Sequence, residues 1–330
     1  MYNKEQIKSI HLEVTSKCQA RCPMCPRRIN GGMLNPLFEL SEITLEDFKN
    51  WFDIEFISQL HSLNMCGNLG DPVVAKDTLE IYQYLRENNP SMSLSMHTNG
   101  SAKTVEWWKA LAKLKVSVTF GIDGLADTHA LYRISTDWNK IIQNASAFIS
   151  EGGEAKWEML VFKHNEHQVE DCKKLSTELG FSYFYEKHTS RFQDGKFHVL
   201  DDAGKTTHIL YPTTRSTDMI TKMKDAVVAI NPVISCKVQN DMQIYVSANG
   251  NVSPCCWLDF SWILPKQDTR IDYMDRIGDL PNLHKQKLAD IFGSGYFKKI
   301  SDTWDDMPLQ ECARQCGKFD KMREQYVNRH

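Results

Sequence analysis

The chain has 330 residues and a net charge of −3, with 42% hydrophobic and 25% charged residues. It is long enough for one large globular domain and a smaller one, and it carries no basic stripe that would indicate a nucleic-acid partner. No apolar run approaches the ~20 residues of a membrane span, and the polar start lacks a signal-peptide core. Ten cysteines in such a chain predict metal or redox use in a reducing cytoplasm instead of disulfides.

Short apolar runs alternate with longer helical patterns from residue 10 to about residue 187, which predicts repeated strand–helix units. Six such units indicate an α/β fold with a parallel sheet and outer helices, either a partial barrel or a doubly wound sheet. In both cases chemistry is expected at the carboxyl ends of the strands. The strands are predicted at 10–14, 62–66, 92–98, 116–122, 156–162 and 181–186.

Capping residues mark the starts of the intervening helices. Thr44, with Asp47 three residues later, opens the first of them. Asp77, Thr104 and Asp137 are expected to open helices over 78–88, 105–114 and 138–151. Asn165 is expected to cap a helix over 166–179, which Gly180 then ends.

The loop after the first strand carries Cys18, Cys22 and Cys25. Thiolates at these spacings can converge on a soft centre, either zinc or an iron–sulfur cluster. A cubane cluster takes four ligands, so three cysteines would leave one iron open to an outside ligand. The loop by itself leaves open the alternative of a zinc site completed by a remote Cys or His.

Other short sequences follow the later strands. After the second strand comes Gly67-Asn68-Leu69-Gly70-Asp71-Pro72, whose glycines let the backbone approach a ligand and whose Asp71 offers a carboxylate to an ammonium group. Asn99 follows the third strand, Asp123 the fourth, and Arg133 comes farther downstream. Taken singly, each of these features is also typical of an ordinary turn or surface residue.

Taken together and in order, the cysteine loop and the sequences after the strands resemble the signature of the radical SAM superfamily over residues 10–187. The resemblance implies a partial (β/α)6 TIM-type barrel and a 4Fe–4S cluster whose open iron is chelated by S-adenosylmethionine (SAM). Asp71 would meet the SAM amino group and Arg133 its carboxylate. The residues implied to bind SAM are Gly67, Gly70, Asp71, Asn99, Asp123 and Arg133. Three positions depart from the family pattern: Asp71 replaces the usual Glu, Gly121 the usual Ser, and Met24 a frequent aromatic residue.

Residues 191–232 lose the alternating pattern and are predicted to bridge two domains, with a short hairpin and a helix over 216–229. The histidines here are too widely spaced for a local metal site. Cys66 and Cys172 stand alone and are expected to act as small apolar residues.

The C-terminal third carries the remaining cysteines. Cys236 and Cys255 flank a hairpin with the turn Ala248-Asn249-Gly250, so the two thiols can meet despite their separation. Cys312 and Cys316 would complete a closed four-thiolate site. Cys256 directly follows Cys255, so the spacing leaves open which of the two is the ligand. Helices are predicted between the pairs at 283–292 and 296–304.

This region, with thirteen residues between Cys236 and Gly250 and four between Gly250 and Cys255, resembles the SPASM and Twitch auxiliary-cluster domains. Its five cysteines favour the Twitch type, with one auxiliary 4Fe–4S cluster, and a structural zinc is the alternative. The expected organisation is a barrel over 1–190, a bridge over 191–232 and an auxiliary domain over 233–330.

The resemblance implies that the enzyme reductively cleaves SAM to a 5′-deoxyadenosyl radical, which abstracts hydrogen from a substrate C–H bond. The substrate would be a peptide or a small metabolite, modified by oxidation, epimerisation or crosslinking. The implied electron donor is an external protein such as flavodoxin or ferredoxin. Cys18 lies too near the start for a preceding leader-binding domain, which mildly disfavours a self-sufficient peptide-modifying enzyme, although a separate binding protein could serve. The alternative is a non-catalytic iron–sulfur or zinc protein that binds a partner.

Overall fold

The computed structural model describes residues 1–214, 232–260 and 267–318. The strands are β1 (Ser9–Leu12), β2 (Ser62–Met65), β3 (Ser93–Thr98), β4 (Val116–Gly121), β5 (Ala155–Leu160), β6 (Tyr183–Lys187), β7 (Phe197–Leu200), β8 (Thr206–Leu210), β9 (Val233–Ile234), β10 (Gln243–Val246), β11 (Val252–Ser253) and β12 (Gly317–Lys318). The α-helices are α1 (Leu45–Trp51), α2 (Ile54–Gln59), α3 (Thr78–Asn88), α4 (Val105–Lys113), α5 (Trp138–Ser150), α6 (Val169–Leu179), α8 (Lys237–Asn240), α9 (Cys256–Phe260), α10 (Gln267–Arg276), α11 (Leu288–Gly293), α12 (Tyr296–Asp302) and α13 (Gln310–Cys316).

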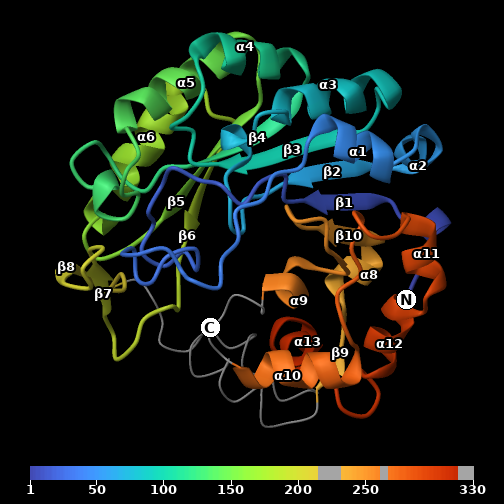
Figure 1. The fold of residues 1–330 in the computed structure, drawn as a ribbon. Coiled ribbons are helices and arrows are strands. Elements are labelled where there is room, and N and C mark those ends of the chain that lie inside the picture. Colours follow the sequence, from blue (N-terminus) through green and yellow to red (C-terminus); the bar gives the residue numbers. More distant parts are fainter. Residues whose placement is uncertain (215–231, 261–266, 319–330) are drawn as a thin grey trace.

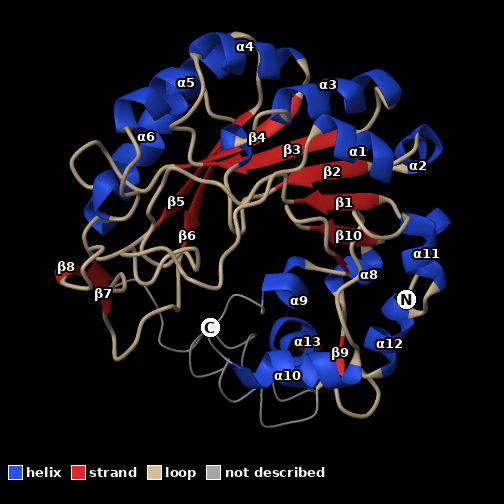
Figure 2. Cartoon of the chain, viewed as in Figure 1, coloured by secondary structure: helices blue, strands red, loops and turns tan. Residues whose placement is uncertain are grey.

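Within these residues the central feature is an eight-stranded sheet with the order β11-β10-β1-β2-β3-β4-β5-β6. Neighbouring strands from β10 to β6 are parallel, and β11 is antiparallel to β10. Helices α1 to α6 cover the outer face of the curved sheet (Figure 1; Figure 2). This α/β arrangement confirms the predicted partial barrel.

Alternation along the strands explains why helices cover only the outer face. In β3, Leu94 and Met96 are buried in the apolar core, whereas Ser95 and His97, which alternate with them, are partly exposed. The same period of two recurs in β1 and β5. A parallel strand buried on both faces would read as a continuous apolar run. The concave face of this sheet therefore stays polar and can line a cavity.

The β10–β11 hairpin of the C-terminal region extends the barrel sheet, whereas β9 and β12 pair in a small sheet of their own. Strand β10 pairs in parallel with β1, with Ile10 opposite Ile244. Ile244 and Val252 belong to the same apolar core as Ile10. The predicted hairpin around residues 248–250 is confirmed as β10–β11, but its place beside β1 was not predicted. The domain boundaries at 190 and 232 stay a prediction.

Most of the expected helix ends are confirmed. Thr44 and Asp47 form a reciprocal capping box at the start of α1. The side chains of Thr104 and Asp137 cap α4 and α5. Gly180 ends α6 with φ +87°, a conformation that favours glycine because it has no Cβ.

Two expected caps have other roles. Asp77 precedes α3 but makes no cap hydrogen bond there, and its carboxylate instead accepts from the backbone N–H of Leu45 at the start of α1 (3.0 Å). Asn165 precedes η4 (Glu166–Gln168) and also caps nothing. Its amide accepts from Phe162 N (2.7 Å) and donates to the carbonyl of Asp123 (3.2 Å). Asn165 therefore ties together the loops that follow β4 and β5.

The remaining predicted elements agree in type and differ at their ends. The hairpin expected in the bridge is β7–β8. The helix expected at 283–292 begins later, at Leu288. Helix α2, with Asp53 as its N-cap, was not predicted. The helix expected at 216–229 lies outside the described residues.

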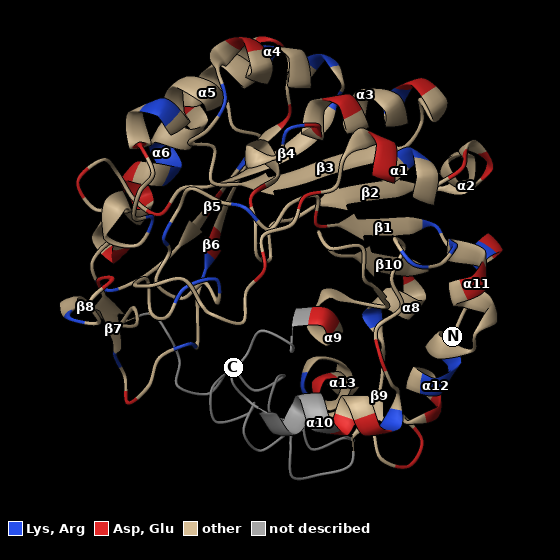
Figure 3. Cartoon of the chain, in the orientation of Figure 1, with Lys and Arg blue, Asp and Glu red and all other residues tan. Residues whose placement is uncertain are grey.

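The outer surface mixes both signs of charge. Both Lys or Arg and Asp or Glu positions are scattered over the outer helices α1 to α6 (Figure 3). In the described part of the chain, no helix combines the length and the apolar character needed to cross a membrane.

Candidate functional site

A cavity of about 410 Å³ lies at the carboxyl ends of the barrel strands. The loops after β1, β2, β3 and β4 all contribute to its wall, because parallel strands end at the same edge of the sheet. Most site residues expected from the sequence are brought together here: Cys18, Cys22, Cys25, Gly67, Gly70, Asp71, Asn99 and Arg133. Asp123 is the exception, since it lies in the layer behind the wall.

Polar side chains approach two of the three thiols. Asn99 Nδ2 donates to Cys18 Sγ (3.6 Å), and Arg133 Nη1 approaches Cys22 Sγ (3.9 Å). Burial raises the pKa of the Cys22 thiol to about 11, and the charge of Arg133 opposes this rise. Hydrogen bonds to sulfur stabilise thiolate and tune an iron–sulfur centre. The wall around the cysteine loop is thus suited to hold thiolates.

Asp71 is buried, and its carboxylate is fully engaged within the protein. One oxygen accepts from Thr98 Oγ1 (2.7 Å) and Val73 N (3.2 Å). The other accepts from the backbone N–H of Asn99 (2.7 Å) and from its side-chain amide (2.5 Å). A carboxylate offers about four lone-pair sites, so these four donors fill them. Burial raises the pKa of Asp71, and the bonds from Asn99 and Thr98 counteract it.

The glycines of the Gly67–Asp71 loop allow backbone segments of the protein to pack closely against each other. A Cβ on Gly70 would collide with the carbonyl of Thr15, and a Cβ on Gly67 would collide with the carbonyl of Gly70. The expectation that they give a ligand room is therefore incomplete, because chain segments of the protein itself fill that space. The glycines let this loop lie directly against the end of β1.

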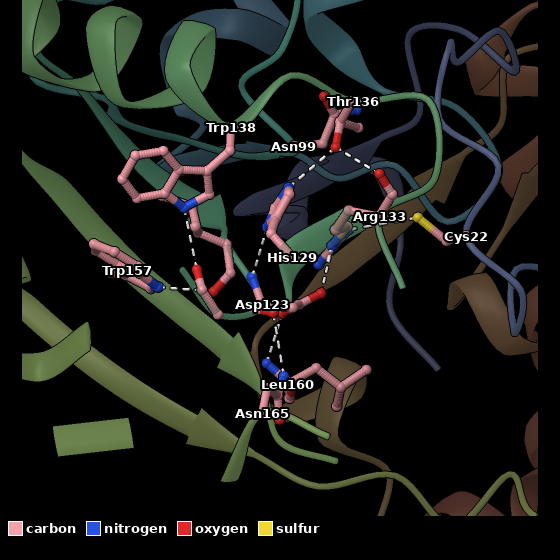
Figure 4. Close-up of polar contacts among 12 residues, drawn as sticks. Cys22, Asn99, Asp123, His129, Arg133, Thr136, Trp138, Trp157, Leu160 and Asn165 are labelled. Atoms are coloured by element: carbon pink, nitrogen blue, oxygen red, sulfur yellow. Dashed lines mark hydrogen bonds and ion pairs between the residues drawn. The ribbon is translucent and has the colours of Figure 1, made fainter. Parts of the chain in front are cut away.

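Asp123 and Arg133 form a buried ion pair (Figure 4). Arg133 Nε donates to Asp123 Oδ2 (2.5 Å), and the Asp123 side chain is fully buried. The other carboxylate oxygen accepts from Leu160 N (2.7 Å). A Cβ on Gly121 would run into the Arg133 guanidinium, so this glycine makes room for the arginine. Asp123 thus orients Arg133 and does not itself face the cavity.

A second hydrogen-bond chain supports this pair from behind. The Asp123 N–H donates to His129 Nδ1 (3.1 Å), so the ring proton sits on Nε2, which faces Thr136 Oγ1 (3.0 Å). The Thr136 hydroxyl donates in turn to the carbonyl of Arg133 (2.6 Å). Burial lowers the pKa of His129 to about 3, and the nearby Arg133 adds to this shift. His129 is therefore a neutral structural support in this network, drawn in Figure 4.

Glu13 joins three parts of the molecule, and sequence analysis did not single it out. Its carboxylate accepts from the backbone of Leu69 and of Gly70 (2.9 Å) in the loop before Asp71. The other oxygen accepts from the hydroxyl of Tyr245 (2.5 Å) on β10. Glu13 is 1% exposed. The end of β1, the Gly67–Asp71 loop and the C-terminal hairpin therefore meet at one buried carboxylate.

We expect Glu13 to make folding stability pH-dependent. Burial raises its pKa from 4.5 to about 7, against the opposing hydrogen bonds from Tyr245, Gly70 and Leu69. Since ionisation is disfavoured in the folded state, this contribution to stability is present below about pH 4.5 and is lost as the pH rises to about 7. The loss is about 3 kcal/mol.

The measurement is anaerobic urea unfolding of wild type and Glu13→Gln at several pH values. Glutamine keeps an oxygen for the two backbone donors and cannot ionise, so wild type should lose stability relative to it with rising pH. A difference that stays constant with pH would contradict this prediction.

The C-terminal cysteines surround a second, smaller cavity of about 130 Å³. Its wall includes Cys236, Cys255, Cys312 and Cys316. The hairpin brings the first two together, and α13 carries the last two on successive turns. The four predicted ligands are thus gathered at one place.

A single metal ion does not suit either group. In the part of the chain that the structure describes, no three His, Cys, Asp or Glu side chains are close enough to hold one ion. A tetrahedral zinc site would need its sulfurs within about 4 Å of each other. The thiols of each group line one cavity. These sulfur-only donor sets, three thiols and four thiols, fit iron–sulfur clusters.

Several residues of the larger cavity were missed by sequence reasoning. Glu158 and Lys187 form an ion pair (2.6 Å) in its wall. Cys66 and Cys256, expected to be apolar or spare, also line it. The alternation of apolar and polar residues in β5 predicts that Glu158 lies on the inner face of the sheet. No local signal predicts that Cys256 reaches a barrel cavity.

Residues 12–175 match the family profile described as the radical SAM superfamily, and residues 236–317 match SPASM, an iron–sulfur cluster-binding domain. No curated protein sequence matches the chain closely. The two matched segments carry the two cysteine groups.

Similar solved structures share this fold at low identity. SuiB from Streptococcus suis bound to S-adenosylmethionine has a TM-score of 0.56 and 13% identity, covering 94% of this chain and 68% of that one. SuiB bound to the precursor peptide SuiA has a TM-score of 0.55 and 14% identity, with 94% and 67% covered. The protein anSMEcpe with bound AdoMet and Kp18Cys peptide has a TM-score of 0.53 and 15% identity, with 94% and 88% covered.

Proposed function

Because this chain belongs to the radical SAM superfamily and carries a SPASM domain, we propose that it cleaves SAM reductively to abstract hydrogen from a substrate C–H bond. The observation that carries the proposal is the convergence of three cysteines, Asp71, Asn99 and Arg133 on one cavity. The donor set fits a 4Fe–4S cluster with one iron open to SAM.

Each residue at the cavity has a distinct task in this proposal. Cys18, Cys22 and Cys25 hold the cluster, which when bound supplies the electron that converts SAM to a 5′-deoxyadenosyl radical. Arg133 presents its guanidinium to the SAM carboxylate, because Asp123 fixes its Nε side. Asp71 holds Asn99 against Cys18 and places the Gly67–Asp71 loop beside the SAM amino group.

The second cysteine group holds one auxiliary 4Fe–4S cluster in this proposal. Cys236, Cys255, Cys312 and Cys316 close all four positions, so this cluster has no site for SAM. A closed cluster near the larger cavity suits transfer of an electron to or from the substrate.

The substrate proposed is a peptide or a small metabolite. Two of the similar structures contain peptides, SuiA with SuiB and Kp18Cys with anSMEcpe, which favours a peptide. The external reductant would be a flavodoxin or ferredoxin. None of the ten cysteines, all of which lie in the described residues, forms a disulfide. The reducing cytoplasmic setting is proposed from the cysteine content of the sequence.

The test is anaerobic incubation of reconstituted, chemically reduced protein with SAM. Methionine and 5′-deoxyadenosine should form together and be identified by mass spectrometry. If the protein holds zinc in place of iron and forms neither product, the proposal that it is a radical SAM enzyme is wrong.

Removing the Asp71 carboxylate is expected to weaken SAM binding. Asp71→Ala leaves the donors of Asn99 and Thr98 without their acceptor, so Asn99 and the Gly67–Asp71 loop lose the contacts that hold them at the cavity. We expect SAM affinity to fall by about 1.5–3 kcal/mol, the scale of a charge-assisted hydrogen bond. Asp71→Asn keeps the size but turns an amide towards the Asn99 donors, so it should lose as much. SAM titration gives the affinity, and iron content should stay normal. Unchanged SAM affinity in both variants would mean that the Gly67–Asp71 loop is an ordinary turn without a role in SAM binding.

A further inference from the structure

The two cavities share part of their walls. Among the described residues, Cys256 and Trp257 line both the larger cavity at the strand ends and the smaller one among the C-terminal cysteines. Both belong to the start of α9, which in Figure 1 lies at the edge of the C-terminal elements nearest the centre of the molecule. The shortest covalent link between the cavities therefore runs through this segment.

The adjacent residues Cys255 and Cys256 have different surroundings. Cys255 lines only the smaller cavity, together with Cys236, Cys312 and Cys316. Cys256 interacts with Asn68, a residue of the loop that follows β2, and lies near Glu13. The structure thus favours Cys255 as the auxiliary-cluster ligand and leaves the thiol of Cys256 facing the larger cavity.

A second thiol lies on the same side of that cavity. Cys66 follows β2, lines the cavity, and lies near Cys256. Neither thiol belongs to either ligand set. A thiol S–H bond is weaker than most aliphatic C–H bonds, so a carbon radical in the cavity can take hydrogen from it.

We propose that Cys256 is the hydrogen-atom donor of this cavity and returns a hydrogen atom to the substrate radical. The inference rests on the proposed function, because that reaction creates the substrate radical. It makes Cys256 a catalytic residue, in direct contact with the substrate carbon.

The step balances as follows. The S–H bond of Cys256 breaks, a C–H bond forms on the substrate, and a thiyl radical is left on Cys256. One electron from the external flavodoxin- or ferredoxin-type donor and one proton from water restore the thiol. The auxiliary cluster that the four C-terminal cysteines would hold would supply electron-transfer chemistry next to Cys256.

The assignment of the two neighbouring cysteines is tested without turnover. The reconstituted holoprotein is treated anaerobically with iodoacetamide, and modified cysteines are located by mass spectrometry. Cys256 should be alkylated, Cys255 should be protected, and added SAM should slow the reaction at Cys256 because it occupies the same cavity. Alkylation of Cys255 with protection of Cys256 would make Cys256 the cluster ligand and overturn the proposal.

Hydrogen transfer is tested with SAM alone in D₂O. Without substrate, the 5′-deoxyadenosyl radical should take deuterium from the exchanged thiol, so that wild type forms deuterium-labelled 5′-deoxyadenosine. The label should fall to background in Cys256→Ser. It should persist in Cys66→Ser and in Cys172→Ala, whose buried thiol on α6 lines neither cavity.

The outcomes separate the two levels of the proposal. Unlabelled 5′-deoxyadenosine from wild type would overturn the role of Cys256 and leave SAM cleavage established. Loss of label only in Cys66→Ser would reassign the donor to Cys66. Absence of 5′-deoxyadenosine altogether would overturn the proposed function and this inference with it.

Discussion

Replacing Cys18, Cys22 and Cys25 together by Ala should remove about half of the iron and all reductive cleavage of SAM. Two cavities of the described structure are lined by cysteines. The three thiols line the larger one, whose wall also includes Asp71 and Arg133, whereas the wall of the smaller one includes neither. Iron analysis after anaerobic reconstitution measures the first effect. Production of 5′-deoxyadenosine measures the second.

The matched control is the double variant Cys312→Ala, Cys316→Ala. It should lose the other half of the iron, while the remaining cluster still changes its electron paramagnetic resonance spectrum when SAM is added. Circular dichroism must show that the variant is folded, because cluster binding and folding are coupled in small sites. A SAM-dependent spectral change in the triple variant would contradict the assignment of the open iron.

Replacing Asp123 by Asn is expected to destabilise the protein by about 3 kcal/mol, because it leaves the Arg133 charge without its buried partner. The Asp123 side chain is fully buried, and that of Arg133 is 20% exposed. SAM affinity should fall as well, since the guanidinium loses the contact that orients it.

A surface pair provides the comparison. Lys298 and Asp302 are also paired (2.7 Å), but their side chains are 73% and 56% exposed. Asp302→Asn should therefore change stability by less than about 1 kcal/mol. Both variants are measured by anaerobic urea unfolding. Equal losses would mean that Arg133 finds another partner when Asp123 is replaced.

Local sequence determined the barrel and the ligand loop. Strand and helix types follow from periods of two and 3.6, and caps such as Thr44 act over three residues. Cys18, Cys22 and Cys25 are close in space largely because they are close in the chain. Patterns of this range need no knowledge of the fold, which is why they could be read from the sequence.

Tertiary structure decided which side chains face the cavity. Asp123 was expected to bind SAM, yet packing places it behind Arg133, and Arg133 fills the space that a side chain at position 121 would need. Asn165 was expected to cap a helix and instead joins two loops. Each outcome depends on which neighbouring side chains and backbone groups compete for the same space or hydrogen bond in the folded protein. A sequence pattern contains no information on these neighbours.

Contacts between residues far apart in the chain could not be predicted from the sequence. Tyr245 reaches Glu13 across 232 positions because β10 pairs with β1, and the same pairing helps bring Cys256 to the barrel cavity. The residues of a strand predict that it will pair, but they do not predict its partner. The register of the pairing and the order of the strands follow from the packing of the whole sheet. Sequence thus determined the two cysteine groups, and only the fold decided that they share a wall.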